Sequence, residues 1–177
     1  MRLRPLVILG LGLFILAPSM LAAQSTSVAL SNNPCLEIEK AKATAGNHSG
    51  EAEALERLAH LQIGCAMANN INREGALVFT NPTLCKMFTD AGDAFSAAAA
   101  SQSSRAPVPG LTAAAASRVG RFNALADWTA AMNAYAQGQF SCFNVGAADQ
   151  VIQDRSGRAI TNIVTLSRQV AEDFNPR

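Results

Sequence analysis

Two of the cysteines in this chain occupy positions at which a thiol could be reactive. Cys35 and Cys85 each stand close behind an Asn-Pro pair, in the segments SNNPCLEI and TNPTLCKMF. Because Asn is a favoured helix cap and Pro is favoured at the first helical position, each cysteine is expected in the first turn of a helix. A thiol at that place has a lowered pKa and can take part in redox reactions. The chain contains no Cys-x-x-Cys pair, however, and we favour a structural role for both residues.

The full set of cysteines is Cys35, Cys65, Cys85 and Cys142. An exported chain with an even number of cysteines normally oxidises them to disulfides. A zinc site would instead need ligands in closely spaced pairs, whereas these cysteines are 30, 20 and 57 residues apart. The sequence therefore predicts two disulfides, and it predicts neither a bound metal nor a cofactor.

Histidine and carboxylate side chains come close to a metal-binding pattern once. Glu53, Glu56 and His60 fall on one face of an expected helix, and the other histidine, His48, lies in the turn GNHSG. A di-iron bundle needs such an arrangement twice, facing the bundle interior. Here it occurs once and on the polar face, which favours a solvated charge cluster.

Asp90 and Asp93, one helical turn apart, are interpreted in the same way, as solvated charges. The chain has no Gly-x-Ser-x-Gly elbow, no His-Glu-x-x-His pair and no phosphate loop. A Ser-His-acid triad would have to use one of only two histidines, and neither has a suggestive setting. We therefore expect that the protein is not an enzyme.

The N-terminus has the three parts of a secretory signal peptide. Arg2 and Arg4 precede an apolar run from Leu6 to Ala17, and small residues follow. A membrane-spanning helix needs roughly 20 apolar residues, more than this run supplies. We expect cleavage after residue 23, and Gln24 at the new N-terminus offers no thiol for a lipid anchor. The mature protein is therefore expected in the periplasm or outside the cell, without a stable membrane anchor.

Removal of residues 1–23 takes two arginines and no acid from 14 basic and 13 acidic residues, so the mature net charge is about −1. A nucleic-acid binder usually concentrates a basic excess on one face, which argues against such a partner. Residues 24–33 are polar and predict a flexible arm. Residues 34–177 are long enough for one domain with one core.

Helical periodicity and capping predict a mainly all-α domain, an up-and-down bundle of four to five helices. The expected helices cover residues 34–45, 50–69, 82 to about 100, 111–137 and 147–174. The last of these is ambiguous, because VIQDRSGRAITNIV also fits a small β-hairpin near 148–164.

Short connections make successive helices antiparallel, so all four cysteines are expected at one end of the bundle. Three pairings of four cysteines are possible, and the sequence does not choose strictly between them. We favour Cys35 with Cys65 and Cys85 with Cys142, because each pair joins neighbouring antiparallel helices.

The helix expected over residues 111–137 offers a candidate partner surface. One flank carries Arg118, Arg121, Trp128 and Tyr135, the residue types that are enriched at binding hot spots. Alternatively, Trp128 belongs to the core and the arginines extend past it. The adjoining apolar stripe, expected to face the core, consists of Leu111, Ala115, Val119, Phe122 and Ala126.

These observations predict a non-catalytic exported protein-binding module, of the inhibitor, immunity or envelope and secretion accessory type. The alternative is a periplasmic or secreted carrier of a small apolar ligand or lipid, with a cavity lined by Phe88, Phe95, Phe122 and Met132. An enzyme is the third and weakest hypothesis. The sequence identifies neither the protein partner nor the oligomeric state.

Overall fold

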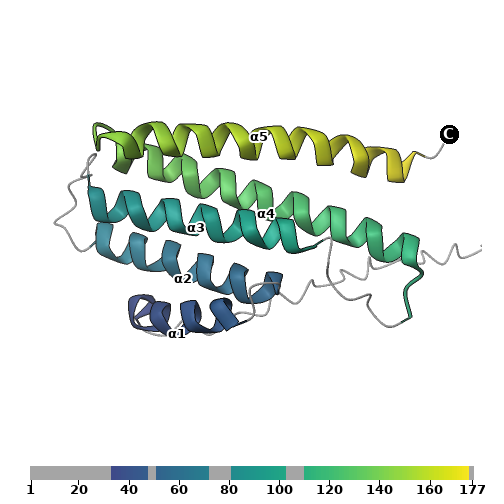
Figure 1. Ribbon diagram of the computed structural model, residues 1–177, viewed down its shortest axis with the longest axis horizontal. Helices are drawn as coiled ribbons and strands as arrows, with labels where there is room; N and C mark the ends of the chain where they lie inside the picture. Colours follow the sequence, from purple (N-terminus) through teal and green to yellow (C-terminus); the bar gives the residue numbers. More distant parts are fainter. Residues whose placement is uncertain (1–32, 48–50, 72–80, 103–109, 176–177) are drawn as a thin grey trace, which may run out of the picture.

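A computed structural model describes residues 33–47, 51–71, 81–102 and 110–175. It contains five helices, shown in Figure 1: α1 (Pro34–Asn47), α2 (Ala52–Ile71), α3 (Pro82–Ser101), α4 (Ala113–Cys142) and α5 (Ala147–Phe174). These ranges contain no strand, so the all-α prediction is confirmed. The expected signal peptide lies outside the described residues and stays a prediction.

The β-hairpin considered near residues 148–164 is wrong, because α5 runs through this segment without interruption. Ile152 and Ala159 are both fully buried. Residues two helical turns apart lie on the same face of a helix, so one α-helix buries both side chains against α4. This packing overrides the local turn preference of the Asp-Arg-Ser-Gly sequence.

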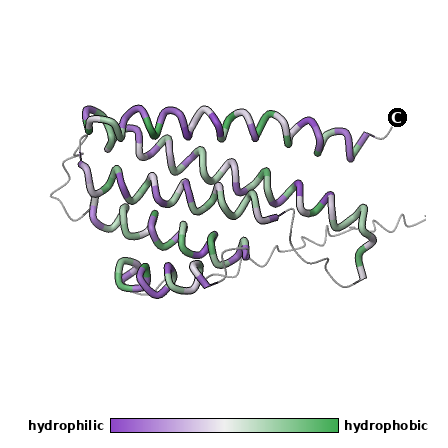
Figure 2. The backbone as a smooth tube through the Cα atoms, viewed as in Figure 1, coloured by the Kyte–Doolittle hydropathy of each residue, from purple (hydrophilic) through white to green (hydrophobic). Residues whose placement is uncertain are grey.

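The helices form an open row. Each helix packs against the next one in the chain, and α3 also touches α5. In Figure 1 the row runs from α1 at the bottom to α5 at the top, and consecutive helices run in opposite directions. Figure 2 shows hydrophobic and hydrophilic residues alternating along the helices, as expected when each helix buries one side. None of the helices described is both long and apolar enough to cross a membrane.

Alanine makes up much of the core. Phe88 and Phe95 of α3 and Tyr135 of α4 are its large buried rings. Small side chains allow helix axes to approach closely, which explains how long contacts form with few large residues. The alanines without any exposed surface are Ala59, Ala66, Ala91, Ala98, Ala131, Ala134 and Ala159.

Both disulfides have the favoured pairing. Cys35 is bonded to Cys65, and Cys85 to Cys142. The predicted cap is present at the start of α3, where the Asn81 side chain accepts hydrogen bonds from the backbone N–H groups of residues 83 and 84. The backbone N–H of Asn81 also donates to the carbonyl of Ser141 at 2.9 Å. The end of α4 is therefore fastened to the start of α3 by a covalent bond and a hydrogen bond.

Candidate functional site: the groove between α3 and α5

The orientation of α4 differs from the expectation. The stripe predicted to face the core is largely on the outside, and Phe122 is 59% exposed. The buried residues of α4 include Ala124, Ala131, Tyr135 and Cys142. Both sides of this helix carry apolar residues, so periodicity alone does not determine which side faces inward. The flank with Trp128 and Tyr135 is the one that meets the neighbouring helices.

Two adjoining hollows follow this flank of α4, with α3 on one side and α5 on the other. The first has a volume of about 330 Å³ and the second of about 630 Å³. Trp128 and Asn162 line both, so the two hollows form one continuous depression. We call this depression the α3–α5 groove.

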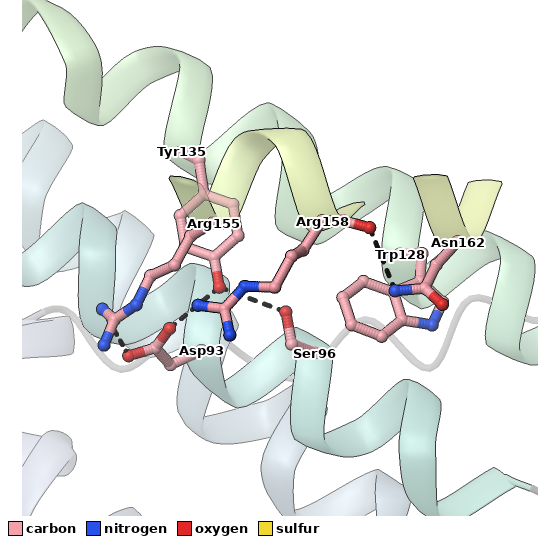
Figure 3. A pocket seen from close by; sticks show the side chains of 7 residues that line it. All are labelled: Asp93, Ser96, Trp128, Tyr135, Arg155, Arg158 and Asn162. Atoms are coloured by element: carbon pink, nitrogen blue, oxygen red, sulfur yellow. Dashed lines mark hydrogen bonds and ion pairs between the residues drawn. The ribbon is translucent and has the colours of Figure 1, made fainter. Parts of the chain in front are cut away.

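The first hollow is polar (Figure 3). The Tyr135 hydroxyl donates to Asp93 Oδ1 at 2.8 Å and lies 3.1 Å from the Ser96 hydroxyl. The Arg155 guanidinium forms an ion pair with Asp93 Oδ2 at 2.7 Å. Both carboxylate oxygens of Asp93 therefore have a partner, one from α4 and one from α5. This small network ties the three helices together.

Burial alters the acidity of the two titratable groups in this network. It raises the pKa of the Asp93 carboxyl, while the Tyr135 hydrogen bond and the charges of Arg155 and Arg158 act in the opposite direction. Burial also raises the pKa of the Tyr135 hydroxyl to about 12, and the bond to Asp93 adds to this shift. The phenol is thus strongly held in its neutral, donating form.

Arg158 also lines the first hollow, one helical turn after Arg155. Its side chain is exposed, and no described carboxylate lies within ion-pair distance of its guanidinium. Figure 3 shows it next to the Asp93 network, on the side toward Trp128. The hollow thus contains two arginines and one aspartate.

The second hollow is mostly apolar, and alanines from α3 and α4 form much of its lining together with Trp128 and Leu166. At its edge, the buried Gln102 donates hydrogen bonds to Glu56 at 3.0 Å and to Asp127 at 2.8 Å. The amide oxygen of Gln102 accepts none. A buried acceptor without a donor is costly, so a donor that entered here would be favoured.

An arginine pair stands at the far end of this hollow. The Arg121 guanidinium binds both carboxylate oxygens of Asp173, at 2.7 to 2.9 Å, and also donates to Ser117 at 2.7 Å. Arg118 lies farther from Asp173, at 3.9 Å. These contacts fix the last turn of α5 against the first turns of α4.

The four residues predicted as a partner surface all lie at or beside this groove, in different settings. Arg121, Trp128 and Tyr135 line it, and Arg118 lies at its end. Tyr135 is only 2% exposed, and Trp128 is half-buried and packs against the core. The flank is therefore partly core and partly accessible.

Sequence reasoning missed the contributions of α3 and α5. Asp93, which the sequence predicts to be a solvated charge, is the centre of the polar network. Arg155, Arg158 and Asn162 carry no sequence motif that marks them as a site, and their segment also fits a hairpin. The useful signal was the spacing of Arg155, Arg158 and Asn162, which places them on one side of a helix.

The other chemical candidates do not converge. His60 is exposed and meets Phe95 edge to face at 5.1 Å, and His48 lies outside the described residues. Within the described ranges, no group of three or more potential metal-ligating side chains is present. Of the residues expected to line a carrier cavity, Phe95 is buried in the core and Phe122 points outward, so the set does not enclose one space.

Comparison with protein-family models, with curated protein sequences and with solved structures finds no significant match.

Proposed function

We propose that the protein is a non-catalytic, exported protein-binding module whose α3–α5 groove receives an acidic, amphipathic helix of a partner protein. The observation that carries this proposal is the groove itself, an elongated depression in which a mostly apolar hollow adjoins a polar hollow with two arginines. The two disulfides agree with an oxidising compartment such as the periplasm or the cell exterior.

The dimensions of the groove suit a helix. Its lining extends along α4 from Ala113 to Tyr135, which corresponds to about 33 Å at 1.5 Å per residue. Because α3 and α5 touch only slightly, none of the described helices covers the side of α4 between them, where a further helix would complete a four-helix bundle. A helix laid there would cover the alanines and the exposed part of Trp128, as in helix-in-groove recognition.

The charges indicate an acidic partner. The charged residues described as lining the groove are Arg121, Arg155, Arg158 and Asp93. Asp173 neutralises Arg121 at the end of the groove, and Arg118 stands beside this pair. Among the residues that line the groove, three arginines thus face one aspartate, and this excess favours association with negatively charged surfaces.

Site-specific photo-crosslinking in the source cells tests this proposal. A photoreactive phenylalanine derivative replaces Gln169, which lines the groove, and in a matched control it replaces Gln137, which is exposed on α4 outside both hollows. We expect Gln169 alone to capture a protein, and mass spectrometry to locate the crosslink in a segment with acidic and apolar residues at helical spacing.

Other outcomes would contradict the proposal. Capture of a lipid at position 169 would favour the carrier alternative. Capture of a basic segment, or capture from position 137 only, would rule out the groove as the acidic-helix site. Absence of any crosslink at position 169 in cells that produce the protein would do the same.

A further inference from the structure

The polar hollow has an uncompensated positive charge. Asp93 carries the only described carboxylate in the lining, and its two oxygens are occupied by Tyr135 and Arg155. The short ion pair with Arg155 compensates the charge of Asp93. Arg158 acts on the same carboxylate only at longer range, so the lining keeps one positive charge in excess, and the Arg158 guanidinium can offer five hydrogen-bond donors.

The surroundings of Arg158 strengthen its attraction for an anion. Trp128 and Tyr135 contribute aromatic walls to the hollow, and Ser96 and Asn162 contribute neutral polar groups. These walls shield a bound anion from part of the solvent, but Arg158 itself is exposed, so an ion pair formed here remains partly screened by water. In addition, Arg155 and Asp93 hold each other in place, which leaves Arg158 as the arginine available to a ligand.

We infer that the hollow is a carboxylate-binding subsite, in which Arg158 receives the side chain of one Asp or Glu of the partner helix. This inference rests on the proposed function and specifies the chemistry of its contact. A carboxylate matches the planar fork of a guanidinium, with two parallel hydrogen bonds. A phosphate dianion is a poorer match, because the Asp93 carboxylate lies in the same hollow and repels a second negative charge more strongly than a first.

The subsite also explains how the two hollows work together. Trp128 and Asn162 belong to both, so a carboxylate on Arg158 lies at the end of the apolar depression. A partner helix with one acidic side chain at this end and small apolar residues beyond it would fill both hollows at once. The arrangement therefore fixes the direction in which the partner helix lies.

A titration with small probes tests the subsite directly. Trp128 is the only tryptophan of the chain, so its indole N–H gives a single, site-specific signal in a nitrogen-proton NMR spectrum. The probe is N-acetyl-glutamate α-methylamide, with the corresponding glutamine derivative as the uncharged control. The titration is carried out at constant ionic strength, and inorganic phosphate forms a third arm.

We expect the glutamate probe to shift the indole signal in a saturable way, and the glutamine probe to leave it nearly unchanged. In Arg158→Gln the apparent affinity for the glutamate probe should fall by about tenfold or more. Arg168→Gln is the matched control, because Arg168 is exposed on α5 and lines neither hollow; this variant should bind like the parent. Equal thermal unfolding of both variants verifies that each is folded.

Three results would overturn the subsite: no saturable shift with the glutamate probe, an equal shift with the glutamine probe, or binding that Arg158→Gln leaves intact. Stronger binding of phosphate than of the glutamate probe would assign the hollow to a phosphate group. If any of these results occurs while position 169 still crosslinks to a partner helix, the groove function stands and only the carboxylate subsite is wrong.

Discussion

The ring of Tyr135 occupies the space that a side chain at Gly92 would need. A Cβ atom at Gly92 would lie 2.2 Å from Cε1 of Tyr135. This contact lets α3 and α4 approach closely enough for the Tyr135 hydroxyl to reach Asp93. Because Gly92 has no side chain, the ring of Tyr135 can pack against α3, and this packing determines where the Tyr135 hydroxyl lies in the groove.

We expect Gly92→Ala to destabilise the protein, because the added methyl group overlaps a buried ring. Overpacking of this kind costs about 1 to 3 kcal/mol. The matched control is Gly157→Ala on α5, where an added Cβ meets no atom within 4 Å. Alanine is the better helix former, so this variant should be more stable than the parent by about 0.8 to 1 kcal/mol. Urea unfolding followed by circular dichroism measures both changes, and equal stability of the two variants would refute the close contact.

Tyr135 should titrate far above an ordinary tyrosine, because burial raises its pKa to about 12. It is the only tyrosine of the chain, so the ultraviolet absorbance of tyrosinate reports this residue alone. We expect a midpoint near the raised value in the folded protein and about 10 in concentrated urea. A midpoint of about 10 in both would show that the hydroxyl is not buried.

The same shift makes stability depend on alkaline pH. The folded state holds the phenolic proton more tightly than the unfolded state does, so the resulting stability is fully present below about pH 10. It should be lost as the pH rises through the folded pKa of about 12. Tyr135→Phe lacks this proton, and its free energy of unfolding should therefore fall less than that of the parent over this range.

The two disulfides should differ in their resistance to reduction. Cys85 and Cys142 are both buried, whereas Cys35 is partly exposed. Attack by a thiolate requires access to a sulfur atom, so a mild reductant should open the Cys35–Cys65 bond first. Stepwise reduction with alkylation and peptide mapping measures the order. Labelling of Cys142 before Cys35 would contradict it.

Loss of the Arg121–Asp173 pair should loosen the end of α5. The pair is bidentate and partly buried, so Arg121→Gln is expected to cost about 1 kcal/mol and to accelerate amide hydrogen exchange near Asp173. Arg118→Gln serves as the control, because its distance of 3.9 Å to Asp173 indicates a weak contact. In Arg118→Gln, the exchange rates at the end of α5 should remain close to those of the parent. Similar acceleration of exchange in both variants would disprove a specific role for Arg121.

The helix starts and the disulfide pairing could be predicted because their causes are local or topological. Asn81 caps α3 through its own side chain, which the Asn-Pro sequence indicates directly. Antiparallel order brings all four cysteines to one end, and the pairing that joins neighbouring helices, such as the start of α3 with the end of α4, is the favoured one of three and the one present. Neither inference needed the details of side-chain packing.

The orientation of α4 and the polar network could not be predicted, because both depend on which helices meet. Phe122 and Tyr135 are both apolar enough for a core, and only the position of α3, with Gly92 opposite Tyr135, selects between the two sides. Likewise, Asp93 and Arg155 come from helices that are not consecutive in the chain. The hydrophobic periodicity of one helix does not indicate which side chains of a non-consecutive helix it will contact.

The order of the disulfides along the chain has a consequence for biogenesis. Cys35 pairs with Cys65 and Cys85 with Cys142, so the first cysteine joins the second and the third joins the fourth. A polypeptide that is oxidised as it emerges N-terminus first meets its cysteines in this same order. Of the three possible pairings, only the native one results when each disulfide forms between two cysteines that follow one another in the chain, the first with the second and the third with the fourth. Maturation of this chain should therefore require an oxidant but no disulfide isomerase.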